Sequence, residues 1–287
     1  MKVKESSLSN ADELPDYSPM LSAYHDAHAT ELREMVASLP IHEGSRVLEI
    51  ACGDGVYSRW IAERVGGTGE VVGVDILPAY LEVARRGAMR EPARHRIRFV
   101  AADIARLPFP DDTFDLVWCA QSLYSLPDPV DALRRMTRVV RAGGEVAVLE
   151  NDSFHHVLLP WPVEVEVAIR RAELLGFVEE SDKPRKYYVG RQLCQVFRAA
   201  GLRECRRRTW ATDRQAPLDR RERAFLEEYL GDLRERAEPH LEPPMRAEFK
   251  RLVDPDSEDY LLDRPDLSVT YVDHVVRGVK PGAGTPS

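Results

Sequence analysis

Cysteine is scarce in this sequence, which has 287 residues and four cysteines, Cys52, Cys119, Cys194 and Cys205. None of them forms a CxxC pair, and no nearby histidine completes the spacing of a zinc site. A disulfide framework is not expected in a chain of this length. We therefore expect a cytoplasmic protein without a structural metal.

Long apolar runs and excess positive charge are also missing. No stretch approaches the roughly 20 apolar residues that span a bilayer, and residues 1–20 lack the apolar core of a secretion signal. The net charge of −8 argues against a protein that grips the nucleic acid backbone. We expect a soluble monomer or homodimer that binds neither membranes nor nucleic acid.

Strand-like and helix-like patterns alternate through the first half of the chain. Five short apolar segments have the composition of buried strands, and amphipathic segments separate them. The strand-like segments are 46–51, 70–75, 96–103, 114–120 and 145–151. This alternation predicts βαβ units and a Rossmann-like, doubly wound α/β fold with a mostly parallel sheet.

The rhythm changes after residue 151. We predict that segments at about 190–213 and 267–279 complete a seven-stranded sheet, and that helical insertions at about 152–188 and 215–262 cap it. The predicted parts are an N-terminal lid or helix (1–40), a cofactor-binding core (41–151) and the remainder of the sheet with its caps (152–287).

The stretch VLEIACGDG (47–55) turns from the first strand into a glycine-rich loop. Gly53 and Gly55 let a ligand approach the backbone. A dinucleotide fingerprint would place a third glycine where Ser58 stands. Asp75, twenty positions after Gly55, suits a ribose-binding acid in more than one cofactor class. The loop alone therefore leaves the cofactor class open.

Three acids end up near one edge of the predicted sheet. Glu49 lies inside the first strand, Asp75 ends the second and Asp103 ends the third. A carboxylate inside a buried strand is costly unless it is paired or hydrogen-bonded. This acidic edge suits a ligand with amines, hydroxyls and positive charge better than it suits a pyrophosphate.

Four motifs in order give a resemblance to a known family. EIACGDG (49–55), VVGVDI (71–76), AADIARLPFPDDTFDLVWC (101–119) and RVVRAGGEVAVLE (138–150) resemble the motifs of class I S-adenosylmethionine (SAM)-dependent methyltransferases. They are most similar to the small-molecule branch related to ubiquinone and menaquinone biosynthesis. The resemblance covers about residues 40–151.

The resemblance implies a set of cofactor contacts. The loop from Ala51 through Gly53 to Gly55 would wrap the methionine part of SAM, with Glu49 beneath it. The remaining implied contacts are Asp75 on the ribose hydroxyls, Ile76 on adenine, Asp103 and Ile104 at the adenine edge, Cys119 near the methyl group, and Tyr24 in an N-terminal lid.

The acceptor is expected beside the stretch ENDSFHHVLLPWP (150–162), which leaves the fifth strand. His155 and His156 can each accept a proton near neutral pH, so they are the candidate catalytic residues. The predicted acceptor contacts are Tyr17, Gln121, Tyr124, Phe154 and Trp161. No acid follows the fourth strand to complete an oxygen-ligand set, so we predict no catalytic metal.

The leading functional prediction is methyl transfer from SAM to a small organic acceptor at oxygen, nitrogen or carbon, leaving S-adenosylhomocysteine (SAH). The setting would be biosynthetic or specialised metabolism. Two alternatives stay open at this point: an NAD(P)-dependent oxidoreductase and a non-catalytic SAM-binding module.

Overall fold

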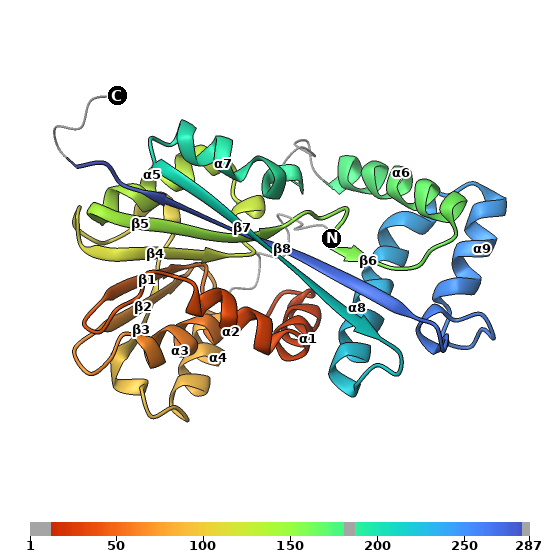
Figure 1. Cartoon of the computed structure of the whole chain (residues 1–287), viewed down its shortest axis with the longest axis horizontal. Coiled ribbons are helices and arrows are strands. Elements are labelled where there is room, and N and C mark those ends of the chain that lie inside the picture. The colour runs from red at the N-terminus through yellow and green to blue at the C-terminus, as the bar shows by residue number, and fades with distance from the viewer. Residues whose placement is uncertain (1–12, 181–186, 283–287) are drawn as a thin grey trace.

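The computed structural model describes residues 13–180 and 187–282 and has helices on both faces of one central sheet (Figure 1). Its strands are β1 (Arg46–Ile50), β2 (Glu70–Asp75), β3 (Ile97–Ala101), β4 (Phe114–Ala120), β5 (Val140–Asn151), β6 (Val157–Leu158), β7 (Arg203–Gln215) and β8 (Ser268–Val279). The predicted Rossmann-like, mostly parallel α/β fold is confirmed.

The strand order creates a crevice at one sheet edge. The order is β3-β2-β1-β4-β5-β8-β6, with β7 paired to β8. Strands β1 to β5 are mutually parallel, and β8 is antiparallel to β5. The order reverses between β1 and β4, and in open α/β sheets ligands bind outside the carboxyl ends of the strands at such a point.

The sheet holds one strand more than predicted. The two-residue β6 pairs with Tyr271 and Thr270 of β8. β6 itself lies within the stretch 150–162, which was predicted to border the acceptor. Strand β5 also begins at Val140, ahead of the predicted start at 145, and a register shift at Phe114/Leu116 absorbs the extra length. The seven-stranded core of the prediction is present.

The helices fall into those that cover the sheet and those that extend beyond it. They are α1 (Ser18–Ala27), α2 (Ala29–Ala37), α3 (Val56–Arg64), α4 (Pro78–Ala88), α5 (Pro129–Val139), α6 (Val163–Glu180), α7 (Val189–Ala199), α8 (Arg220–Ala237) and α9 (Pro243–Val253). None of the described helices combines the length and apolarity that crossing a bilayer requires.

Local sequence explains where several helices begin. Asp128 caps α5 by accepting from the amides of Val130 and Asp131, and Asp219 forms a capping box with Glu222 at the start of α8. Each such cap satisfies amides that the helix itself cannot pair.

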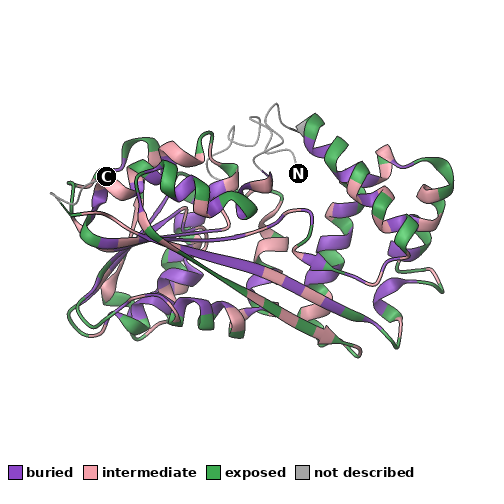
Figure 2. Cartoon of the chain, turned by 45° about the horizontal axis from the view of Figure 1, so that its top comes forward, coloured by how far each residue is buried: buried purple, intermediate pink, exposed green. Residues whose placement is uncertain are grey.

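Two apolar layers sandwich the sheet because side chains alternate along each strand. Val47 and Trp118 face the layer that holds α2 and α3, whereas Leu48 and Val117 face the layer that holds α5 and α7. Buried residues run along the strands between these layers (Figure 2).

The long pair β7–β8 joins the sheet to the extra helices. The second half of β8 pairs with β5, and its first half pairs with β6 and runs towards α8 and α9 (Figure 1). Helix α8 packs on both α1 and α6. The N-terminal helix and the late helices therefore meet over the carboxyl edge of the sheet.

Candidate functional site

A cavity of about 340 Å³ lies at the carboxyl edge of the sheet, within the size range of small-molecule sites. One wall comes from the ends of β1, β2, β4 and β5, and the other comes from α1, α8 and the end of α6. The lining residues extend from the glycine loop at one end of the cavity to a group of aromatic residues at the other.

The two glycines of the loop do different work. Gly53 has φ +51°, and a Cβ there would meet no atom within 4 Å, so its backbone is open on the cavity side. Gly55 has φ +72°, and a Cβ there would lie 2.8 Å from the Phe99 ring. Gly53 therefore permits close approach of a ligand, whereas Gly55 permits α3 to pack on β3.

Asp75 fixes the loop from the end of β2. Its Oδ2 accepts from the Gly53 amide at 2.9 Å and its Oδ1 accepts from the Leu77 amide at 2.9 Å. The side chain lines the cavity and is largely buried, and that burial raises its pKa. Each carboxylate oxygen keeps a second lone pair that a ligand hydroxyl could use.

Glu49 lies beneath the loop and is 1% exposed. Ser58, in the first turn of α3, donates a short hydrogen bond to its carboxylate. Burial raises the pKa of Glu49 to about 8, so the group is mostly protonated at neutral pH. A cation bound in the cavity would favour its ionised form.

Glu150, near the end of β5, accepts hydrogen bonds from the loop that follows β4. Its Oε1 accepts from the amides of Leu123 and Tyr124 at 2.6 and 3.2 Å, and burial raises its pKa to about 8. These bonds shape the loop after β4, which brings Gln121 and Tyr124 to the cavity.

Helix α1 closes the cavity over the glycine loop. Tyr24 donates from its hydroxyl to Asp273 Oδ1 at 2.9 Å, which ties α1 to β8. Its ring also packs edge-on against Phe225 of α8, with centroids 5.4 Å apart. Tyr17 lines the same wall, 6.4 Å from the Tyr80 ring.

The far end of the cavity carries polar groups within an aromatic wall. Asp232 and Arg236 of α8 form an ion pair at 2.7 Å, and Arg236 also contacts the fully buried Glu173 at 3.3 Å. The guanidinium lies 4.6 Å from the Phe177 ring centroid. The ring of Tyr229 meets His156 edge-on at 5.5 Å.

His156 faces the cavity in a defined tautomer. Its Nδ1 lies 3.1 Å from the carbonyl oxygen of Asp152, which can only accept, so Nδ1 carries the hydrogen and Nε2 keeps a lone pair. Burial lowers the pKa of His156 to about 4. The ring is therefore neutral at physiological pH.

Ten of the predicted site residues line the cavity. They are Tyr17, Tyr24, Glu49, Ala51, Gly53, Asp75, Ile76, Gln121, Tyr124 and His156. The sheet-edge members come together because the strands are parallel and end at one edge, as the sequence suggested.

Seven predicted residues lie outside the cavity lining. Three of them were predicted to border the acceptor, and their contacts elsewhere explain their positions. Trp161 packs toward Phe249 of α9, and Phe154 stacks on Tyr188 at 4.8 Å. His155 points outward, with Nδ1 2.7 Å from Arg191. These three placements correct the expectation that they border the acceptor.

The other four are predicted cofactor contacts. Cys119 is fully buried in the layer that holds α5 and α7, and Gly55 serves packing as described above. Asp103 is exposed and caps a turn by accepting from the Ala105 amide at 2.8 Å, with half-buried Ile104 beside it.

Several cavity residues escaped sequence reasoning. The largest group is a stripe on α8 formed by Phe225, Tyr229, Asp232 and Arg236. Their spacing of four, three and four residues is helical, but the buried Leu226, Leu230 and Leu233 beside them form a more continuous apolar stripe. Others include His25 of α1, Tyr57 of α3 and Tyr80 of α4.

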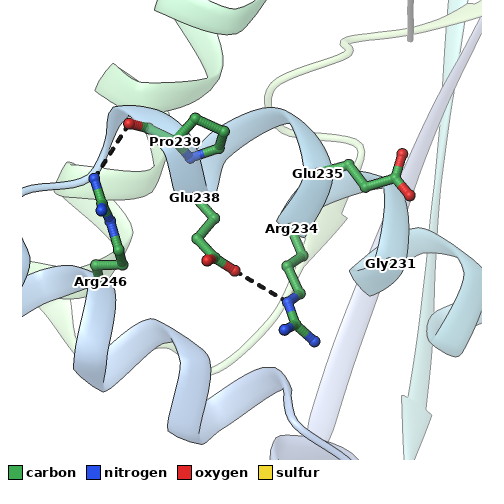
Figure 3. Close-up of a pocket in the computed structure, with 6 residues that line it drawn as sticks. All are labelled: Gly231, Arg234, Glu235, Glu238, Pro239 and Arg246. Atoms are coloured by element: carbon green, nitrogen blue, oxygen red, sulfur yellow. Dashed lines mark hydrogen bonds and ion pairs between the residues drawn. The ribbon is translucent and has the colours of Figure 1, made fainter.

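A second hollow of about 510 Å³ lies beside the end of α8 and the start of α9 (Figure 3). Arg234 binds Glu238 at 3.0 Å, and Lys250 binds the same carboxylate at 2.8 Å. Arg246 donates to the carbonyl of Pro239 at 3.2 Å. These groups hold the two helices together, so we assign this hollow no ligand.

Metal ligation finds no support in the described ranges, where no three His, Cys, Asp or Glu side chains are grouped to hold an ion.

Comparison with known proteins finds a methyltransferase-like region in the chain. The methyltransferase-domain model matches residues 47–144. The match covers about a third of the chain, and this part is similar to methyltransferases. The predicted resemblance to methyltransferases that use SAM as their cofactor is thereby confirmed over this region. The open Gly53 backbone, the acidic edge and the capped cavity fit that cofactor.

Individual relatives match over part of their length. The ubiquinone/menaquinone biosynthesis C-methyltransferase UbiE of Ectopseudomonas mendocina is 44% identical over 110 residues, which are 38% of this chain and 43% of the relative. A demethylmenaquinone methyltransferase of Listeria welshimeri is 31% identical over 139 residues, 48% of this chain and 58% of the relative. The chain thus spans about half the length of these relatives.

A solved structure extends the likeness of fold. The YcgJ protein of Bacillus subtilis superposes with a TM-score of 0.58 at 18% identity, covering 89% of this chain and 100% of that one. At this identity the likeness concerns the fold alone.

Proposed function

We propose that this protein transfers a methyl group from SAM to a small, uncharged organic acceptor that carries a ring and a proton-bearing nucleophile. The observation that carries the proposal is the single cavity that joins the glycine loop to the aromatic stripe of α8. The relatives named for quinone biosynthesis add support for a ring-bearing acceptor.

The cofactor half of the proposal uses the sheet edge. Asp75 would accept from the ribose hydroxyls, Ile76 would pack on adenine, and the Gly53 backbone would border the methionine part. Asp103 and Ile104, at the adjacent end of β3, stay the predicted adenine contacts. When bound, SAM supplies an electrophilic methyl group on a sulfonium.

The acceptor half follows from the charges at the far end. Of the described residues that line the cavity, Arg236 alone carries a permanent positive charge, and two carboxylates already neutralise it. A carboxylate or phosphate on the acceptor would find no unpaired cation to offset its desolvation. Aromatic side chains instead offer stacking surface for an uncharged ring.

His156 is the proposed catalytic residue. Its Nε2 lone pair can accept a hydrogen bond from the hydroxyl or N–H of the acceptor and so orient the attacking atom. That atom gains positive charge as its bond to the methyl carbon forms, and its proton becomes strongly acidic. A base with a pKa of about 4 then suffices to take it.

Two steps test the proposal. Titration calorimetry with SAH, with NAD and NADH as controls, should give binding of SAH alone. Mass spectrometry should then show a methyl group added to phenols, hydroquinones or aromatic amines but not to their carboxylated or phosphorylated analogues. Binding of NADH without SAH would favour an oxidoreductase, and SAH binding without transfer to any acceptor would favour a binding module.

The proposal extends to the setting of the protein. We expect a cytoplasmic monomer or homodimer that does not bind nucleic acid, in line with the net charge of −8. The division into residues 1–40, 41–151 and 152–287 belongs to the same proposal. Size-exclusion chromatography with light scattering measures the oligomeric state.

A further inference from the structure

His25 is a buried histidine whose ring nitrogens make no hydrogen bond with the described residues. It lies on α1, lines the cavity and is 7% exposed. Neither Nδ1 nor Nε2 has a hydrogen-bond partner among the described residues. Buried polar groups are almost always hydrogen-bonded, and an unpaired one costs about 1–3 kcal/mol. An unpaired imidazole facing a cavity therefore points to a ligand.

Other histidines of the same region are satisfied. Nδ1 of His28 lies 3.0 Å from the carbonyl of Tyr24, and Nδ1 of His156 lies 3.1 Å from that of Asp152. His25 is held by packing instead, edge-on to the Tyr57 ring at 5.3 Å. Its orientation is fixed while both nitrogens stay available.

A carboxylate lies beside this imidazole. Asp54, in the glycine loop, has Oδ2 3.7 Å from Nδ1 of His25, beyond hydrogen-bond distance. Its Oδ1 accepts from the Val56 amide at 3.1 Å. Burial opposes ionisation of Asp54, but the neighbouring imidazole and the Val56 amide hold its pKa below the ordinary value.

We propose that His25 and Asp54 together form a clamp for the amino-acid end of the cofactor, His25 donating an N–H to its carboxylate and Asp54 accepting from its ammonium. The inference rests on the proposed function, and it assigns to α1 the recognition of a zwitterion. A donor beside an acceptor, both lining the cavity, is the complement of an α-amino acid.

Other groups near the clamp are already committed. The Tyr24 hydroxyl donates to Asp273, and Arg236 is neutralised at the far end of the cavity. The Asp75 carboxylate accepts two loop amides. His25 is therefore the donor that this wall offers to a carboxylate.

The test compares two ligands that differ only at the amino-acid end. SAH carries it, whereas 5′-methylthioadenosine has a methyl group in its place. Calorimetry on the wild-type chain should show much tighter binding of SAH. His25→Phe, which keeps a ring against Tyr57, should weaken SAH binding about tenfold to a hundredfold, as expected for a lost charge-assisted hydrogen bond, and leave methylthioadenosine within twofold.

A second variant probes the other half of the clamp. Asp54→Asn keeps an oxygen for the Val56 amide but loses the charge, so it should also weaken SAH selectively. His155→Phe, at an exposed histidine outside the cavity, is the matched control and should change neither affinity. Thermal unfolding of each variant checks that it folds.

The outcomes separate the clamp from the proposed function. An unchanged SAH-to-methylthioadenosine ratio in His25→Phe overturns the clamp, and so does an equal loss for both ligands, which would indicate a structural role. Failure of the wild-type chain to bind either ligand overturns the proposed function and the clamp with it.

Discussion

Replacing Glu150 by glutamine should make the protein more stable at neutral pH. Glu150 is 1% exposed and accepts two loop amides, and burial raises its pKa from 4.5 to about 8. Between these values the folded protein keeps a proton that the unfolded chain has released. The free energy of unfolding therefore falls as pH rises through this window.

The size of this change in the free energy of unfolding follows from the gap between the pKa values of Glu150 in the folded and unfolded states. Each pKa unit is worth about 1.4 kcal/mol, so from pH 5 to pH 7 the wild type should lose roughly 3 kcal/mol that Glu150→Gln does not lose. Glutamine resembles the protonated carboxyl, and its carbonyl can still accept from Leu123 and Tyr124. The two proteins should converge near pH 4.5.

Urea unfolding at several pH values measures this difference, and melting curves should show a gap of roughly 5 °C at pH 7. Glu145→Gln is the control, because this carboxylate lies near the surface of the same strand, 3.5 Å from Arg277. Parallel pH profiles for wild type and Glu150→Gln would show that burial does not hold the proton on Glu150.

Three further changes probe the cavity. In the wild type, the affinity for cationic SAM relative to SAH should rise as pH passes through about 8, because only the ionised Glu49 carboxylate attracts the sulfonium. Glu49→Gln should abolish this rise, and calorimetry at pH 6 and pH 9 measures it. His156→Phe should lower kcat by about 10²–10⁴ with SAH affinity unchanged, whereas His155→Phe should keep wild-type kcat; equal rates for all three proteins would remove the proposed base. Asp75→Ala should weaken SAH binding at least tenfold, about 1.4 kcal/mol, since a ribose acceptor and two loop bonds are lost together; unchanged affinity in calorimetry would exclude the ribose contact.

The sequence predicted the fold because local signals and topology agree. Strands buried on both faces read as continuous apolar runs, and their alternation with amphipathic helices leaves few arrangements. β6 was missed because two residues are too short to carry a periodic signal. The start of β5 was misjudged because Gly143 and Gly144 suggested a turn where the strand continues through a bulge.

The end of the cavity at the sheet edge was predictable for a related reason. Glu49, Gly53 and Asp75 lie at or just after strand ends, and parallel strands bring their carboxyl ends to one edge whatever the rest of the chain does. Asp103 follows the same rule, yet it turns to cap its own loop. The rule predicts the edge on which a residue lies, but not the direction of its side chain.

The acceptor end depends on packing between segments far apart in the chain. The stretch after β5 was expected to border the acceptor, but Trp161 and Phe154 each pack against other aromatic residues. The opposite wall comes from α8, some 75 residues later. Its cavity-facing stripe mixes polar residues with aromatic ones, which obscured the apolar pattern in the sequence. Such a wall can be recognised only once it is known which helix covers the edge.

The two ends of the cavity come from different elements, and this affects how acceptor choice can change. The groups proposed to hold the cofactor belong to strand ends and their loops, so altering them disturbs the sheet edge itself, as the two amides on Asp75 illustrate. The α8 stripe lies on one face of a helix whose leucines anchor it independently. Substitutions at Tyr229 or Asp232 can therefore reshape the acceptor end while the cofactor end keeps its geometry. On this argument, variants of α8 should change which acceptor is methylated with little effect on SAH affinity, whereas variants of the glycine loop should change both.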